Sequence, residues 1–190
     1  MALFGRKRRF VVTNLFVAVD ESAFSAILTL CSGAQKRIAD SGDDFAVASE
    51  ELAHVAGGLL DRLDSATHAA CFGEVFDDEG EAGDHGQECF AELSTRYLAA
   101  PDDARGAPEQ AMPGERRAVV MLTVGYEGER PALENPPDSV VALKEALTQL
   151  VALHHMDALL LAHVHHAPSH PEDKLTDEQM LANYPELLSL

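Results

Sequence analysis

The chain has 190 residues, which is enough for one domain with a sizeable core and barely enough for two. Its apolar fraction of 46% is typical of a globular protein, and with no Trp and eight Phe the core must consist mostly of Leu, Val and Ala. The formal charge of -18 repels phosphate backbones and excludes general nucleic-acid binding.

The N-terminus combines basic and apolar residues. We expect residues 1–9, which hold four of the fourteen cations, to be a basic flexible arm. The apolar run that follows is too short to span a membrane, and Thr13 and Asn14 interrupt it, so no transmembrane segment is expected. An odd count of widely spaced cysteines without a CxxC motif fits free thiols in a reducing compartment, and a soluble, cytoplasmic protein is expected. The cysteines are Cys31, Cys71 and Cys89.

The first half predicts one strand followed by helices. Phe10–Val19 is apolar on both faces, which is typical of a central strand. A helix capped by Asp20 or Ser22 follows, and after a break a longer amphipathic stripe runs from Phe45 to Ala66. The acidic stretch 74–84 is expected to be a loop, and Phe90, Leu93 and Tyr97 mark a third helix.

The second half predicts a strand, a helix and a strand. Residues 99–117 are rich in Pro and Gly and are expected to form an internal surface linker. Apolar runs at Ala118–Tyr126 and Ala158–His165 flank a helix that begins at Asp138 or Ser139, and this order predicts two parallel strands joined by a right-handed crossover. Thr176-Asp-Glu-Gln179 has the spacing of a capping box and opens a last short helix.

These elements predict an α+β fold in a single domain that covers residues 1–190. The first strand is too hydrophobic to stand alone, so all three strands are expected to be neighbours in one small three-stranded sheet. The element order is β-ααα-β-α-β-α, with most helices inserted between the first and second strands.

Six of the nine histidines lie between His154 and His170. His163 and His165 are two apart on a strand and share a face, so with His166, His170 or an acid they could hold zinc through imidazole nitrogens. The alternative is a strand end at which partly exposed histidines replace other medium-sized side chains. HExxH is absent from the sequence.

No motif for nucleophilic catalysis or nucleotide binding is present in the sequence, since GxSxG, GxxxxGK[ST] and GxGxxG are all missing. The sequence therefore favours a non-catalytic protein-interaction or regulatory module, whose sheet edges bind a protein partner or form a homodimer. The alternative is a zinc-binding regulator or hydrolase that uses the histidine cluster. A third hypothesis is a small-molecule sensor with its pocket between the long second helix and the sheet.

Several C-terminal segments resemble a known family, the domain of unknown function numbered fifteen-seventeen. The segments are Val119–Val124, Leu159–Val164, Leu175-Thr-Asp-Glu178 and Tyr184-Pro-Glu-Leu187. The family occurs in cyanobacteria, plant plastids and other bacteria, and one plant member is associated with acclimation to fluctuating light. The resemblance implies no catalytic residues, and it implies that Tyr184 is an aromatic anchor that packs on the sheet. This chain departs from the pattern because His163–His166 stand where a Glu and a Trp are expected.

Overall fold

The computed structural model describes residues 8–96, 116–170, 172–173 and 175–190. The expected basic arm and internal linker fall almost wholly outside these ranges, as does Tyr97 of the expected third helix. Within the described ranges, five strands form one sheet, in the spatial order β4 (Leu159–Ala167), β3 (Ala118–Glu127), β1 (Phe10–Val19), β2 (Ala66–Phe76) and β5 (Leu188–Ser189). Every neighbouring pair is antiparallel. The α+β class is confirmed, but the sheet is larger than predicted.

The central strand β1 (Phe10–Val19) follows the expected boundaries. It pairs with β2 on one side and β3 (Ala118–Glu127) on the other, and all ten of its residues are buried. A strand covered by helices on both faces needs apolar residues on both, which explains the near-continuous apolar run. β3 in turn pairs with β4 (Leu159–Ala167), so the three predicted strands are neighbours in one sheet, as expected.

The prediction of three strands was wrong because two strands were missed. In the sequence-based prediction of β2 (Ala66–Phe76), Ala66 ended the second helix, residues 74–76 belonged to an acidic loop, and residues 67–73 had no assignment. Its many alanines, together with Gly73, give it low β-propensity, and pairing with β1 over most of its length overrides that preference. The missed strand β5 (Leu188–Ser189) is too short to show any periodicity.

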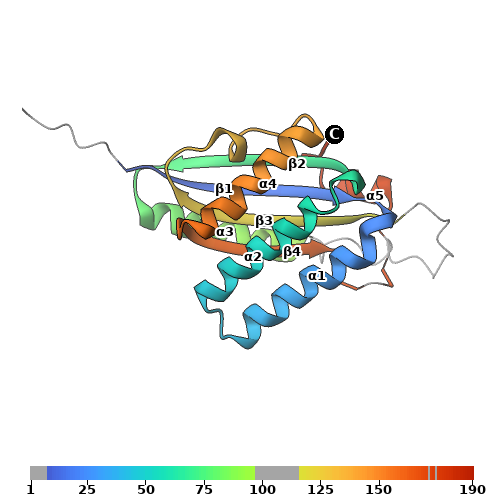
Figure 1. Cartoon of the computed structure of the whole chain (residues 1–190), viewed down its shortest axis with the longest axis horizontal. Coiled ribbons are helices and arrows are strands. Elements are labelled where there is room, and N and C mark those ends of the chain that lie inside the picture. Colours follow the sequence, from blue (N-terminus) through green and yellow to red (C-terminus); the bar gives the residue numbers. More distant parts are fainter. Residues whose placement is uncertain (1–7, 97–115, 171, 174) are drawn as a thin grey trace, which may run out of the picture.

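The prediction of a parallel pair was also wrong, since β3 and β4 are antiparallel. After β3, residues 128–139 carry the chain back along the sheet, past the short helix η3 (Pro131–Leu133). Helix α4 (Val140–His155) then returns over the same distance, so β4 begins beside Tyr126, where β3 ended (Figure 1). A parallel pair would need the helix alone to carry the chain back along the sheet. Here residues 128–139 already do so, and the helix reverses the direction again.

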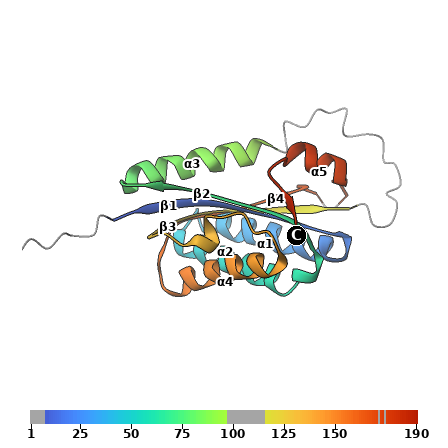
Figure 2. The same cartoon turned by 90° about the horizontal axis from the view of Figure 1, so that it is seen from above.

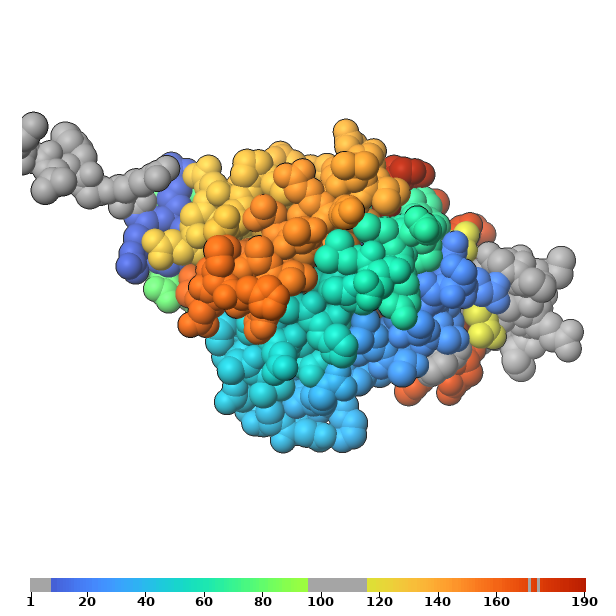
Figure 3. All heavy atoms as spheres, viewed as in Figure 1, coloured from blue at the N-terminus to red at the C-terminus, as the bar shows by residue number. Residues whose placement is uncertain are grey.

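Three helices cover one face of the sheet, which we call the α1 face. They are α1 (Glu21–Asp40), α2 (Phe45–Leu60) and α4, and Figure 3 shows them as a continuous layer. Asp20 and Ser139 are the observed N-caps of α1 and α4, which resolves both alternatives left by the sequence. The main core lies between these helices and the sheet. Leu52, Val55, Ala56 and Leu59 of α2 are buried where the sensor hypothesis needed a pocket.

Two helices lie on the opposite face, which we call the α3 face (Figure 2). α3 (Glu79–Arg96) begins inside the stretch expected to be a loop, and Asp78 accepts a hydrogen bond from the Glu81 backbone N–H in its first turn. Gly86 lets this helix approach β4, because a Cβ there would lie 2.2 Å from Leu161 Cδ2. The short α5 (Asp177–Asn183) has the predicted capping box. Tyr184 follows it and is fully buried against the ring of Phe16, so the anchor role is confirmed.

The two edges of the sheet differ. At the β4 edge, Gln35 of α1 donates a hydrogen bond from Nε2 to the Val164 carbonyl, and α1 and α2 extend past the strand (Figure 1). At the β2 edge, β5 pairs only with His68 and Ala69. In the described ranges no helix is long and apolar enough to cross a membrane.

Candidate functional site

The side of β2 from Ala70 to Phe76 that faces away from β1 is called the free edge. Within the part of the chain that the structure describes, these residues pair with no strand other than β1. An edge strand normally carries protection such as a charge pointing inward, a proline or a covering loop, because its unpaired backbone groups can accept another strand. The free edge has no proline and a single charged residue, Glu74.

Two large apolar side chains are exposed along the free edge. Phe72 keeps 43% of its surface exposed and Val75 keeps 44%, and the alternation of a strand places them on opposite faces. The Phe72 ring contacts Phe16 edge to face, with centroids 5.4 Å apart. The free edge therefore offers a partner both unpaired backbone and apolar surface.

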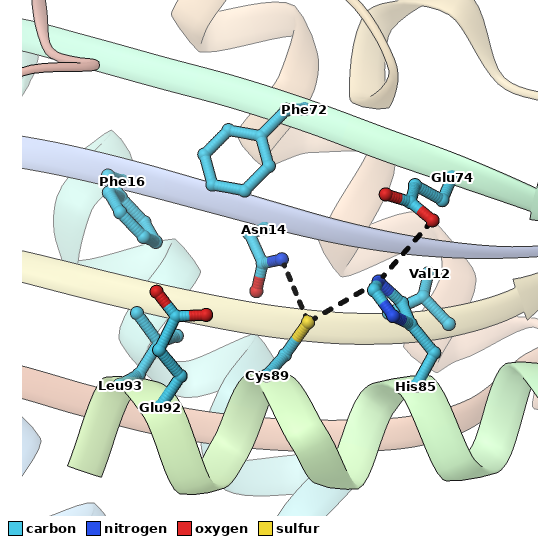
Figure 4. Close-up of a pocket in the computed structure, with 9 residues that line it drawn as sticks. All are labelled: Val12, Asn14, Phe16, Phe72, Glu74, His85, Cys89, Glu92 and Leu93. Atoms are coloured by element: carbon cyan, nitrogen blue, oxygen red, sulfur yellow. Dashed lines mark hydrogen bonds and ion pairs between the residues drawn. The ribbon is translucent and has the colours of Figure 1, made fainter. Parts of the chain in front are cut away.

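A pocket of about 200 Å³ opens on the α3 face next to the free edge (Figure 4). We call it the edge pocket. Strands β1 and β2 form one wall and helix α3 forms the other. Its lining residues are Val12, Asn14, Phe16, Phe72, Glu74, His85, Cys89, Glu92 and Leu93. Phe72 and Glu74 belong to both the free edge and the edge pocket, so the two features form one continuous site.

A chain of polar contacts crosses the floor of the edge pocket. Thr123 Oγ1 donates to Asn14 Oδ1 at 2.6 Å, and Asn14 Nδ2 donates to the Cys89 sulfur at 3.4 Å. Cys89 Sγ lies 3.5 Å from His85 Nε2, and the same nitrogen lies 3.8 Å from Glu74 Oε2. These polar contacts link β3, β1, α3 and β2, and they explain why a polar residue, Asn14, is buried in the central strand.

Cys89, His85 and Glu74 do not have the geometry of a catalytic triad. In a triad the base uses one ring nitrogen for the nucleophile and the other for the orienting carboxylate. Here both the thiol and the carboxylate approach Nε2 of His85. Burial also raises the pKa of Cys89, helped by the charges of Glu92, Glu74 and Glu88, although the hydrogen bond from Asn14 opposes this. The thiolate needed for nucleophilic attack is therefore disfavoured.

The other two cysteines are less reactive still. Burial raises the pKa of Cys31 to about 12, and burial with the charge of Glu134 raises the pKa of Cys71 to about 12. All three thiols are free. Cys31 and Cys71 are buried in the core, whereas Cys89 is only partly buried and faces the edge pocket.

The predicted metal ligands are divided between the two faces of β4. His163 and His165 share the α3 face, and both rings pack against Phe90 of α3, with centroid distances of 4.6 and 4.9 Å. Their Nε2 atoms are buried without a hydrogen-bond partner. Burial lowers the pKa of both, that of His165 to about 4, so both rings are neutral at physiological pH.

The other two predicted ligands lie elsewhere. His166 belongs to the α1 side, where its Nε2 contacts the Ser32 hydroxyl at 3.2 Å and its Nδ1 contacts the Pro168 carbonyl at 2.9 Å. His170 is exposed in the segment after β4. A hollow of about 520 Å³ at the β4 edge is lined by His165 and His166 but not by His163 or His170. Among the described residues no group of three or more His, Cys, Asp or Glu side chains is arranged to hold a metal.

Sequence reasoning missed the residues of the edge pocket. Asn14 was noted only as an interruption of an apolar run, although a lone amide in a central strand signals a buried polar partner. His85 and Cys89 stand four apart on α3 and therefore share a helix face, which is a detectable spacing. Phe72 and Glu74 carried no signal because their strand had not been recognised.

A family model matches nearly the whole described chain. The model of a family described as "Protein of unknown function (DUF1517)" matches residues 9–190. No curated protein and no solved structure matches the chain.

Proposed function

The chain belongs to the DUF1517 family, whose description names no activity, and we propose that it is a non-catalytic module that binds a partner protein by strand addition to the free edge of β2. One observation carries the proposal: the free edge lacks a neighbouring strand in the described ranges and exposes Phe72 and Val75. In strand addition, backbone hydrogen bonds supply affinity and side chains on alternate positions supply specificity.

The contrast with the opposite edge supports this choice. Helix α1 packs on β4, and Gln35 of this helix already donates a hydrogen bond to the Val164 carbonyl of the strand. The contacts within the edge pocket also fit a binding role better than a catalytic one, because His85 meets Cys89 and Glu74 at one nitrogen.

Substitution of Val75 by Lys tests the proposal, because a lysine on an edge strand blocks pairing with another strand. Val141→Lys is a matched control, since Val141 is 76% exposed and belongs to α4, not to the free edge. Immobilised wild type, Val75→Lys and Val141→Lys are exposed to lysate of the source cells, and the retained proteins are quantified by mass spectrometry. Light scattering of the three proteins detects self-association.

The proposal requires at least one protein, or a second copy, that associates with wild type and Val141→Lys but not with Val75→Lys. Identical association of all three proteins would refute it. A strict monomer that retains nothing at high concentration would refute it as well.

A second candidate function is zinc binding by His163 and His165. Its supporting observation is that both Nε2 atoms are buried without a hydrogen-bond partner. Zinc sites use three or four protein ligands, whereas the His166 ring contacts Ser32 and Pro168 on the other face of β4 and His170 is exposed after the strand. Elemental analysis separates this candidate from the first.

A further inference from the structure

We infer that the partner segment places one Lys or Arg side chain in the edge pocket, between Glu74 and Glu92. This inference rests on the proposed strand addition at the free edge and specifies the chemistry of the added strand. It makes the partner an extended, basic segment and not a second copy of this chain.

The size of the edge pocket fits one side chain. Pockets for small molecules occupy roughly 300–1,000 Å³, whereas the edge pocket has about 200 Å³. Phe72 and Glu74 line it on the side of the free edge, and both are exposed (Figure 4). A ligand that arrives as part of a strand needs only this much enclosed space, because its backbone is held outside the pocket.

The position of the pocket matches the geometry of an added strand. Side chains directly opposite each other on neighbouring antiparallel strands have Cβ atoms about 4.5–5.5 Å apart. A residue of the partner that lies opposite Phe72 or Glu74 on the α3 face therefore stands at the rim of the edge pocket. A long side chain on this residue enters the pocket without any movement of α3.

The lining of the pocket selects a long cation. Val12, Phe16 and Leu93 are buried and provide an apolar floor for an aliphatic stem. Glu74 and Glu92 lie at opposite ends of the pocket in Figure 4, and among the described residues that line it none is a Lys or Arg. Lys and Arg bury an apolar stem while the charged head stays near water and carboxylates. The exposed ring of Phe72 adds a cation–π contact.

The charge around the free edge disfavours a second copy as the partner. Glu74 is followed by Asp77, Asp78 and Glu79, and the whole chain carries a formal charge of -18. A second copy carries the same acidic residues and the same net charge, and like charges at an interface oppose association. The negative electrostatic field of the chain attracts a basic segment before the two make contact.

Selection of peptides from a random display library tests the inference without assuming a sequence. The targets are the full-length wild type, the double variant Glu74→Gln/Glu92→Gln, Val75→Lys and the control Glu145→Gln. Glu145 is an exposed carboxylate on α4, on the other face of the sheet. Selected peptides are then synthesised with Lys, Arg, Gln or Glu at the enriched position, and their binding is measured by fluorescence polarisation.

Wild type and Glu145→Gln are expected to enrich peptides with Lys or Arg at one fixed position. Changing this residue to Gln should weaken binding to wild type about tenfold, as for the loss of a charge-assisted hydrogen bond. The same change should have little effect with Glu74→Gln/Glu92→Gln. Binding should also weaken as salt is raised.

Two other results overturn the inference in different ways. If the selected peptides lose binding to Val75→Lys but have no fixed Lys or Arg, the strand-addition function stands and the basic anchor is wrong. If no peptide is enriched, or if binding does not depend on Val75, the inference fails together with the proposed function.

Discussion

The ring of Phe72 packs edge to face on the buried ring of Phe16 at 5.4 Å, yet Phe72 leaves 43% of its own surface exposed. The pair therefore joins the core of the sheet to its outer edge. Phe16 also contacts Tyr184 edge to face, with ring centroids 6.3 Å apart. This arrangement fixes the position of Phe72 while leaving its outer surface available to a partner.

Substitutions at these two rings should separate stability from binding. Phe16→Ala should lower the free energy of unfolding by about 3–5 kcal/mol, as large-to-small changes of buried aromatics do. Phe72→Ala should cost only about 1 kcal/mol, the energy of an aromatic pair contact, and should weaken partner binding. Urea denaturation measures both values. Equal losses would show that Phe72 is a core residue and not part of an interface.

The hydrogen bond between Thr123 and Asn14 gives a second prediction. Both residues are buried, so Asn14→Ala leaves the Thr123 hydroxyl unsatisfied and should cost about 1–3 kcal/mol of stability. Replacing both residues by Val should cost less than the sum of the single changes, with a coupling on the order of 1 kcal/mol. A double-mutant cycle in urea provides the measurement. Strict additivity would mean that the contact does not organise the floor of the edge pocket.

The strands show how much of the fold could be predicted from the sequence. The boundaries of β1 and the adjacency of β1, β3 and β4 were predictable because each strand is a long apolar run. The strand β2 was not, since its alanines, Gly73 and Glu74 resemble a helix end and a loop. The direction of β4 depended on the path of residues 128–139, which no periodicity records.

The candidate site was harder to predict than the fold. The edge pocket joins Asn14, Phe72, His85 and Cys89, which come from three elements separated along the chain. The strand β2 was not recognised and the start of α3 was placed too late, so these side chains could not be brought together in advance. The histidine cluster was visible in sequence because its members are close neighbours, but alternation along β4 placed His166 away from His163 and His165.

Acid should destabilise the protein through His165. Burial, together with the neighbouring His163 and His166, lowers the pKa of His165 to about 4, whereas an unfolded His titrates near pH 6.5. Between these values the unfolded state binds more protons, so stability is greatest above pH 6.5 and falls as the pH drops toward 4. For His165 alone the loss is on the order of 3 kcal/mol.

Substitution of His165 by Gln should make this pH dependence shallower. The matched control is His155→Gln, since His155 is exposed on α4. Urea denaturation from pH 7 to pH 4, run on wild type and both variants, gives the slopes. If His165→Gln keeps the wild-type slope, the histidines packed against Phe90 do not govern the acid response.

Metal removal should not change the thermal stability. His163 and His165 contact the Phe90 ring, and two ligands are fewer than a structural zinc site requires. We therefore expect the same melting temperature with and without a chelator. Stoichiometric zinc in purified protein, with a lower melting temperature after chelation, would instead favour the metal-binding candidate.

The most direct measurement is hydrogen exchange of the β2 backbone amides, with and without a bound partner segment. Strand addition should slow the outward-facing amides between Ala70 and Phe76 by about tenfold or more, because they become hydrogen-bonded, while exchange in β4 stays the same. A bound segment that protects β4 or the helices, and leaves Ala70–Phe76 exchanging at the rate of the free protein, would contradict the account.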